Sequence, residues 1–231
     1  RRDEVVVVAV LDEAAAVEDA LAAVIAAGGA WYLGQQPAQT TGFVTPALAQ
    51  SSGEATEAEI LPDRILGDEN APVTVVEYAS YTCGHCANFH ADQFEKLKAE
   101  YIDTGKVKFI HREVYFDQFG LRAGLLAQCG GDLRYYGISG MLYEQQKEWI
   151  GSGESDEIFD NLITLGKVAG LSEDEARACL DFEDNPMVAK LVDTFRHNAE
   201  ADGINATPTL VIDGEKHSNM SYEKLSELLD G

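Results

Sequence analysis

The four residues Cys83-Gly84-His85-Cys86 combine types and spacing that can do redox chemistry. They follow an apolar, β-branched run at 73–78 and open a helix-like stretch at 87–101. A Cys-x-x-Cys motif at a strand-to-helix turn is typical of a redox dithiol. Because the helix N-terminus stabilises a thiolate at the first cysteine, Cys83 is the predicted attacking sulfur and Cys86 the shielded, resolving one.

A metal site is the alternative use of two such cysteines. A structural zinc site needs four ligands, and the sequence contains no second Cys-x-x-Cys and no His-x-x-x-His pair. His90 could join Cys83 and Cys86 around a soft ion such as Cu(I), although a polar residue on a helix flank is the simpler interpretation. We therefore expect no metal and no cofactor, and keep a Cys/His copper-binding module as the alternative of another class.

The composition and net charge exclude some classes of binding partner. The chain has 231 residues, 45% of them hydrophobic, which suits one well-buried domain with an insertion or two small domains. A net charge of -23 repels phosphate backbones and anionic lipid headgroups, so we expect no nucleic-acid partner. The remaining two cysteines, Cys129 and Cys179, are either a disulfide formed in an oxidising compartment or two separate buried thiols.

The first fifty residues differ from the rest. An apolar run at 20–33 and the small residues Ala47-Leu48-Ala49 fit an export signal, but the leading segment is acidic where a signal is basic. The segment is therefore interpreted as an export signal or membrane tether, an oligomerisation helix, or a disordered extension. The small, polar and acidic stretch at 50–59 is a predicted linker.

The elements that must position the dithiol are predicted from about Ile60 onward. Strands at 73–78 and 106–110 flank the helix at 87–101, which makes a right-handed βαβ unit. A second half follows much later, with strands at 209–212 and 215–218, a turn between them and a terminal helix from Ser221. Between these halves the pattern is helical, with stretches at 121–128, 135–150 and 157–168 and a Ser172-x-x-Glu175 capping box.

These stretches together resemble a known family. The segments are 71–78, the run 81–90 around the dithiol, and Ala206-Thr207-Pro208-Thr209 with the strand behind it. In this order they resemble the DsbA-like family of exported thiol:disulfide oxidoreductases, which have a thioredoxin fold with inserted helices. The resemblance implies an α/β, thioredoxin-like fold with an all-helical subdomain, preceded here by the export or tether segment. Cys129 and Cys179 look like an alphaproteobacterial subgroup in which the corresponding pair forms a second, structural disulfide.

The resemblance also implies roles for single residues. Pro208 would be the cis-proline facing the dithiol, with Thr207 before it and Gly84 beside it in the substrate-binding region. Glu77 would be a buried acid that exchanges a proton with the resolving thiol, the alternative being a strand-edge charge. His85 would lower the pKa of Cys83 and favour the reduced dithiol, whereas we expect His90 to matter little.

The sequence therefore predicts an exported, periplasmic thiol:disulfide oxidoreductase acting as an oxidase on cysteine-containing proteins. A membrane redox partner must restore the dithiol, either an oxidising DsbB-like or a reducing DsbD-like protein. Gly84-His85 and Thr207 also suit an oligomeric disulfide isomerase or reductase of the same family, which the N-terminal segment would assemble or tether to the inner membrane. The expected domains are the signal or tether and linker at 1–59, a discontinuous thioredoxin-like domain at 60–117 and 197–231, and a helical insertion at 118–196.

Overall fold

The computed structural model describes residues 59–183 and 185–231. The predicted export or tether segment and nearly all of the acidic linker lie outside these described residues. Within them, none of the helices combines the length and apolar character needed to cross a membrane.

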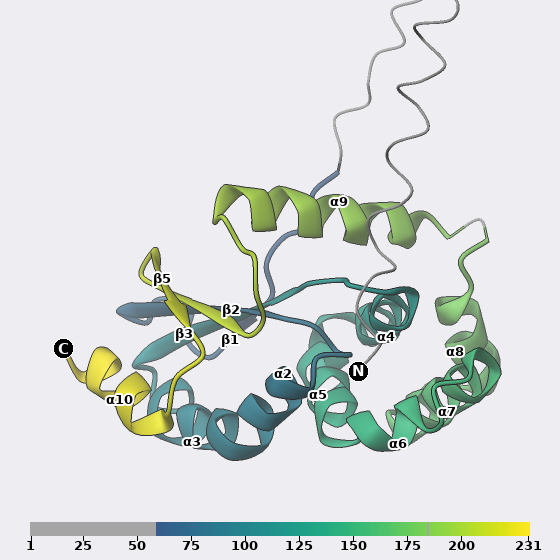
Figure 1. Ribbon diagram of the computed structural model, residues 1–231, viewed down its shortest axis with the longest axis horizontal. Helices are drawn as coiled ribbons and strands as arrows, with labels where there is room; N and C mark the ends of the chain where they lie inside the picture. The colour runs from purple at the N-terminus through teal and green to yellow at the C-terminus, as the bar shows by residue number, and fades with distance from the viewer. Residues whose placement is uncertain (1–58, 184) are drawn as a thin grey trace, which may run out of the picture. The chain divides into compact units, whose positions relative to one another are not determined.

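A five-stranded mixed sheet forms the centre of the fold (Figure 1). Its spatial order is β1-β3-β2-β4-β5, and only the β2–β3 pair is parallel. The strands are β1 (Ile65–Leu66), β2 (Val73–Ala79), β3 (Val107–Glu113), β4 (Thr209–Ile212) and β5 (Glu215–Ser218). The fold is thus thioredoxin-like, with β2 in the middle. The short β1 was not predicted, and β3 runs three residues beyond its predicted end.

Side chains along β2 alternate between the two faces of the sheet because strand residues have a period of two. Val75 packs in the apolar core shared with Phe89 and Leu97 of the following helix. Val76 and Tyr78 pack on the opposite face. The same alternation directs Glu77 to the face of Val75, toward the helix that begins at the dithiol.

The helix after the dithiol begins at Gly84, three residues earlier than predicted. It runs as α2 (Gly84–Phe89), a π-helical turn (His90–Phe94), α3 (Glu95–Leu97) and a second π-helical turn (Lys98–Ile102). The early start follows from Cys83, whose extended backbone makes it the N-cap residue. The dithiol therefore straddles the helix start, with Cys83 before it and Cys86 in its first turn.

Helices fill the chain between β3 and β4. They are α4 (Gln118–Cys129), α5 (Gly131–Glu144), α6 (Gln146–Ile150), α7 (Ser155–Val168), α8 (Glu173–Leu180) and α9 (Pro186–Ala201). The single helix predicted at 135–150 is wrong, since the chain breaks at Gln145 with its φ at -102° and ψ at 24°. Ser172 and Glu175 do form the predicted capping box. Helix α9 was not predicted.

Helices cover both faces of the sheet (Figure 1). Helix α9 lies over one face, where its Phe195 packs on the cluster of Val76, Tyr78 and Ile110. The helix that begins at the dithiol and the terminal α10 (Tyr222–Asp230) lie on the other face. Helices α4–α8 have a separate core that also takes in Tyr81 and Cys86. The division of the chain at 118 and 196 stays a prediction.

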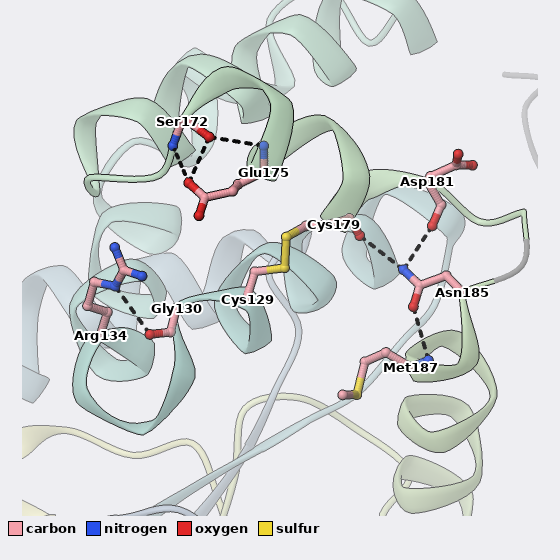
Figure 2. Close-up of a disulfide and its surroundings, with 9 residues drawn as sticks. All are labelled: Cys129, Gly130, Arg134, Ser172, Glu175, Cys179, Asp181, Asn185 and Met187. Atoms are coloured by element: carbon pink, nitrogen blue, oxygen red, sulfur yellow. Dashed lines mark hydrogen bonds between the residues drawn. A yellow bond between two sulfur atoms is a disulfide. The ribbon is translucent and has the colours of Figure 1, made fainter.

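A disulfide joins Cys129, the last residue of α4, to Cys179 in α8 (Figure 2). The carbonyl of Cys179 accepts a hydrogen bond from the Asn185 side chain, whose oxygen caps α9 by accepting from the amide of Met187. The bond thus connects two helices of the insertion near the point where α9 begins.

Candidate active site

The two sulfurs of the dithiol lie in different environments. Both are free thiols in this structure. Cys83 is half-buried, whereas Cys86 is fully buried with 0% of its surface exposed. The amides of Cys86 and Ala87 both donate to the carbonyl of Cys83, which closes the first helical turn over the pair. An incoming thiol can reach only the first sulfur.

Electrostatics add to this asymmetry. Burial alone would raise the pKa of the Cys83 thiol. Hydrogen bonds from the side chains of Thr207 and Cys86, and from the backbone amides of Cys86 and His85, outweigh this effect and lower the pKa. Burial raises the pKa of Cys86, and its hydrogen bond with Cys83 raises it further. At neutral pH the outer sulfur is therefore the better thiolate and leaving group, and the inner one holds its proton.

Thr207 and Pro208 lie against the first sulfur. The peptide bond between them is cis. The Sγ of Cys83 lies 3.6 Å from the carbonyl oxygen of Thr207, which accepts from the thiol. Strand β4 begins at Thr209, directly after this pair, and Thr209 is aligned with Tyr78 of β2. The antiparallel pairing of β4 with β2 thus brings residues 207 and 83 together across a long stretch of sequence.

Two polar side chains that the sequence did not single out hold the active-site loop. Gln146 of α6 donates from Nε2 to the carbonyls of Tyr81 and Cys83, at 2.7 Å and 3.0 Å. Thr82 donates to Asp117 at 2.7 Å, and Asp117 also caps α4 by accepting from two amides. Helix α6 and the N-cap residue of α4 therefore hold the segment 81–83 directly. No local pattern marked these residues, because each acts from an element distant in sequence.

Glu77 is fully buried in the middle strand of the sheet, so its interpretation as a strand-edge charge is wrong. Its Oε2 lies 2.9 Å from Nε2 of His90, while its Oε1 is buried and has no hydrogen-bond partner among the described residues. The side chain of His90 is only 10% exposed, so it is a largely buried residue and not an exposed one on a helix flank. The expectation that His90 matters little loses its structural basis.

His111 completes a buried cluster with these two residues. It is the residue of β3 aligned with Glu77, and the possible ligand atoms of Glu77, His90 and His111 lie within 4.8 Å of one another. Both ring nitrogens of His111 contact tyrosine hydroxyls, and Nε2 of His90 contacts Glu77. Hydrogen bonds therefore hold both imidazole rings of this cluster in place. Neither sulfur belongs to it, so the copper-module alternative gains no support from the described residues.

Gly84 and His85 between the cysteines are exposed. A side chain at Gly84 would meet no atom within 4 Å, so the surface there is open. His85 contributes to the lowered pKa of Cys83 through its backbone amide. Together with Tyr143 and His90, these two residues line a groove of about 1030 Å³ between the dithiol helix and helices α5 and α6.

Comparison with known proteins agrees with this geometry. A family model described as Thioredoxin matches residues 60–231. A Rickettsia prowazekii protein named for protein-disulfide oxidoreductase activity is 31% identical over 194 residues, which are 79% of this chain and 70% of that protein.

Two solved structures are similar to about three quarters of this chain. The structure of alpha-DsbA1 from Wolbachia pipientis has a TM-score of 0.67 and 29% identity, covering 74% of this chain and 90% of its own. Oxidised BdbD from Bacillus subtilis has a TM-score of 0.64 and 25% identity, covering 73% of this chain and 91% of its own.

Proposed function

This chain belongs to the DsbA-like family of thioredoxin-fold proteins and is a thiol:disulfide oxidoreductase, and from that premise we propose that it acts as an oxidase of exported proteins. The observation that carries the proposal is that the pKa of Cys83 is lowered whereas the pKa of Cys86 is raised. A stabilised Cys83 thiolate favours the reduced dithiol over the disulfide, which makes the disulfide form a good oxidant.

The reaction proceeds by two successive thiol–disulfide exchanges. A substrate thiolate attacks Sγ of Cys83 in the disulfide form, the bond to Cys86 breaks, and Cys86 leaves with the electron pair and takes up a proton. The second thiolate of the substrate then attacks the substrate sulfur of this mixed disulfide and releases the Cys83 thiolate. The substrate gains a disulfide, and the enzyme is left with a Cys83 thiolate and a Cys86 thiol that a membrane redox partner must reoxidise.

Glu77 is the proposed proton donor and acceptor for Cys86. The unpartnered Oε1 supports this role, because a buried carboxyl oxygen without a hydrogen bond is costly unless a proton or a water reaches it. The carboxylate is also among the groups that raise the pKa of Cys86, after burial and the contact with Cys83. His90 would hold the carboxyl in place through its 2.9 Å contact.

Substrate binding is proposed along Thr207, Pro208 and Gly84. The carbonyl of Thr207 faces the sulfur at 3.6 Å, where it can accept from the amide of an extended substrate segment. Gly84 leaves room for that segment, since no atom lies within 4 Å of the place where its side chain would be.

A periplasmic or otherwise exported location is part of the proposal. A disulfide between Cys129 and Cys179 persists in an oxidising compartment and not in a reducing cytosol. Alkaline phosphatase fused after residue 50 and after residue 231 tests it: activity in both fusions supports export, and activity in neither contradicts it.

The direction of electron flow is tested by the redox potential of the dithiol. Equilibrating the protein with glutathione buffers should give a potential in the oxidising range of about -180 to -120 mV. A double Cys129→Ala, Cys179→Ala variant serves as control, because it should return the same value. A potential at or below about -270 mV, the thioredoxin value, would instead make the protein a reductant.

An oligomeric disulfide isomerase is the second candidate, favoured by the Gly84-His85 pair and by Thr207 before the proline. An isomerase starts from the reduced Cys83 and holds its substrate through several exchanges. Light scattering of the full chain and of a chain lacking residues 1–50 discriminates: an oligomer lost on truncation favours the isomerase, and a monomer in both favours the oxidase.

A further inference from the structure

The proposed function raises a problem of proton access at Cys86. This sulfur gains a proton when a substrate attacks Cys83 and loses one when a redox partner is attacked, and in both cases a second protein is bonded to Cys83. Cys86 has no exposed surface even in the free protein, and burial keeps its pKa raised. The proton must therefore cross the interior while the active-site face is covered.

A row of hydrogen bonds begins at Tyr143, which packs in the same core as Cys86, and runs to Glu113. The hydroxyl of Tyr143 lies 2.8 Å from Nε2 of His111, and Nδ1 of His111 lies 2.9 Å from the hydroxyl of Tyr135. That hydroxyl donates to Oε1 of Glu113 at 2.9 Å. His111 and Glu113 are two apart in β3 and so share a face, which lets Tyr135 bridge them.

The hydrogen bonds of this row all run the same way, with each donor on the Tyr143 side and each acceptor on the Glu113 side. Because Tyr135 donates to Glu113, it must accept from Nδ1–H of His111. Burial lowers the pKa of His111 to about 4, so the ring is neutral and its Nε2 accepts from Tyr143. Protonating Glu113 reverses all three bonds, since its O–H then donates to Tyr135, Tyr135 to Nδ1, and Nε2–H to Tyr143.

The two ends of the row lie at different openings. Tyr143 packs in the same core as Cys86 and lines the groove beside Gly84 and His85. Glu113 lines a separate pocket of about 30 Å³, large enough for a water molecule, together with Arg64 and Gln128. The second opening lies between the segment 61–64, β3, α4, α5 and α9, and residues 83–86 do not line it.

We propose that Tyr143, His111, Tyr135 and Glu113 form a proton-transfer chain that connects Glu77 and Cys86 with solvent at the Glu113 pocket. When Cys86 attacks, its proton passes to Glu77, crosses from the unpartnered Oε1 to Tyr143 through a bound water, and displaces one proton along each further step until Glu113 is protonated. When Cys86 is released as a thiolate, the same steps run backward. The two half-reactions reset the chain, so no further co-reactant is needed.

Glu113 has the properties of the outer terminus. Burial raises its pKa to about 7, while hydrogen bonds from Tyr135 and Gln128 and the charge of Arg64 act in the opposite sense. It can therefore both give and take a proton near neutral pH. The titratable and charged groups that face it come from several elements: Arg64 just before β1, Tyr135 and Tyr136 of α5, and Tyr81 and Tyr115 in loops.

The test separates the two steps of a reaction with insulin disulfides. Stopped-flow measurement follows the attack of Cys83 and then the resolution by Cys86 between pH 5 and 9. Wild-type resolution should show an inflection near pH 7, at the pKa of Glu113. Tyr135→Phe and Glu113→Gln should abolish this inflection and slow resolution about tenfold or more, with attack by Cys83 unchanged.

Tyr136→Phe is the matched control. This substitution also removes a tyrosine hydroxyl beside β3. That hydroxyl donates to the carbonyl of Arg64 and accepts from the amide of His111, but it is not part of the proposed proton-transfer chain. The variant should keep the wild-type pH profile. A Tyr135→Phe profile equal to wild type, or an equal loss in Tyr136→Phe, would overturn the proton chain. Failure of the wild-type protein to exchange disulfides with insulin would instead contradict the proposed function.

Discussion

At the residue scale, the distinction between Cys83 and Cys86 comes from opposite solvation of two sulfurs in one helical turn. Cys83 is half-buried and its thiolate is stabilised by Thr207, Cys86 and two backbone amides. Cys86 faces a core that holds Tyr81 and Tyr143. A thiolate that is both reachable and stabilised is the group that forms mixed disulfides.

Single-cysteine variants test this assignment. Cys86→Ala should accumulate mixed disulfides with cysteine-containing proteins through Cys83, because the resolving thiol is missing. Cys83→Ala should accumulate few, since the remaining sulfur is buried. Non-reducing electrophoresis with mass spectrometry of the linked peptides measures both. Similar trapping by the two variants would contradict the assignment.

The pKa of Cys83 tests which neighbours stabilise its thiolate. Thr207→Val should raise this pKa toward that of a free thiol, because it removes the side-chain hydrogen bond to the sulfur. His85→Ala is the informative comparison, since it keeps the backbone amide. Thiolate absorbance at 240 nm against pH gives both values. If the pKa of Cys83 rose more in His85→Ala than in Thr207→Val, the imidazole of His85 would be the main group that stabilises the thiolate.

At the element scale, strand register and helix contacts assemble the site. The parallel register of β2 with β3 places Glu77 beside His111, and the antiparallel register of β2 with β4 places residue 207 beside residue 83. Helix α6 supplies Gln146, and the N-cap of α4 supplies Asp117, so two elements of the helical segment fix the loop before the dithiol.

The disulfide between α4 and α8 is expected to stabilise the fold without taking part in turnover. It spans a sequence separation of 50 residues, so closing this loop should contribute about 4 kcal/mol in the chain-entropy model. Replacing Cys129 and Cys179 by Ala should lower the melting temperature by roughly 10 °C. Calorimetry and an insulin reduction assay check the two parts. Lost activity with unchanged stability would contradict a structural role.

At the scale of the whole molecule, Glu113 couples stability to pH. Its pKa is raised to about 7 in the folded protein from an ordinary value near 4.5, so between these values the folded state holds a proton that the unfolded state has lost. The stability that this bound proton contributes to the folded state is fully present below about pH 4.5 and is lost as the pH rises through 7. His111 acts oppositely below 6.5, because its folded pKa is lowered to about 4.

Glu113→Gln isolates the first of these effects. Glutamine cannot ionise, so the variant should gain free energy of unfolding relative to wild type as the pH rises from 5 to 8. Urea unfolding at both pH values measures the difference. Glu175→Gln is a suitable control, since Glu175 is an exposed carboxylate whose pKa is lowered by Ser172. A constant difference between wild type and Glu113→Gln at the two pH values would contradict the raised pKa.

Local signals in the sequence were enough to predict the dithiol, its helix and most of the sheet. Apolar, β-branched runs predict β2 and β4, alternation predicts the first part of β3, and the Ser172 capping box predicts the start of α8, because these patterns depend on neighbours within a few residues. The DsbA-like family could likewise be predicted, since its motifs are short and ordered. The roles of Thr207, Pro208 and Glu77 stay predictions.

Tertiary structure alone decided which polar side chains meet under the dithiol. His111 and Glu113 lie past the predicted end of β3, and the continued alternation through Glu113 was the signal that could have placed them. No local pattern could pair Glu77 with His90, or Tyr135 and Tyr143 with His111, because these contacts join elements through strand register and helix packing. Burial then sets their pKa values, since desolvation depends on the surrounding core and not on the residue's own sequence neighbours.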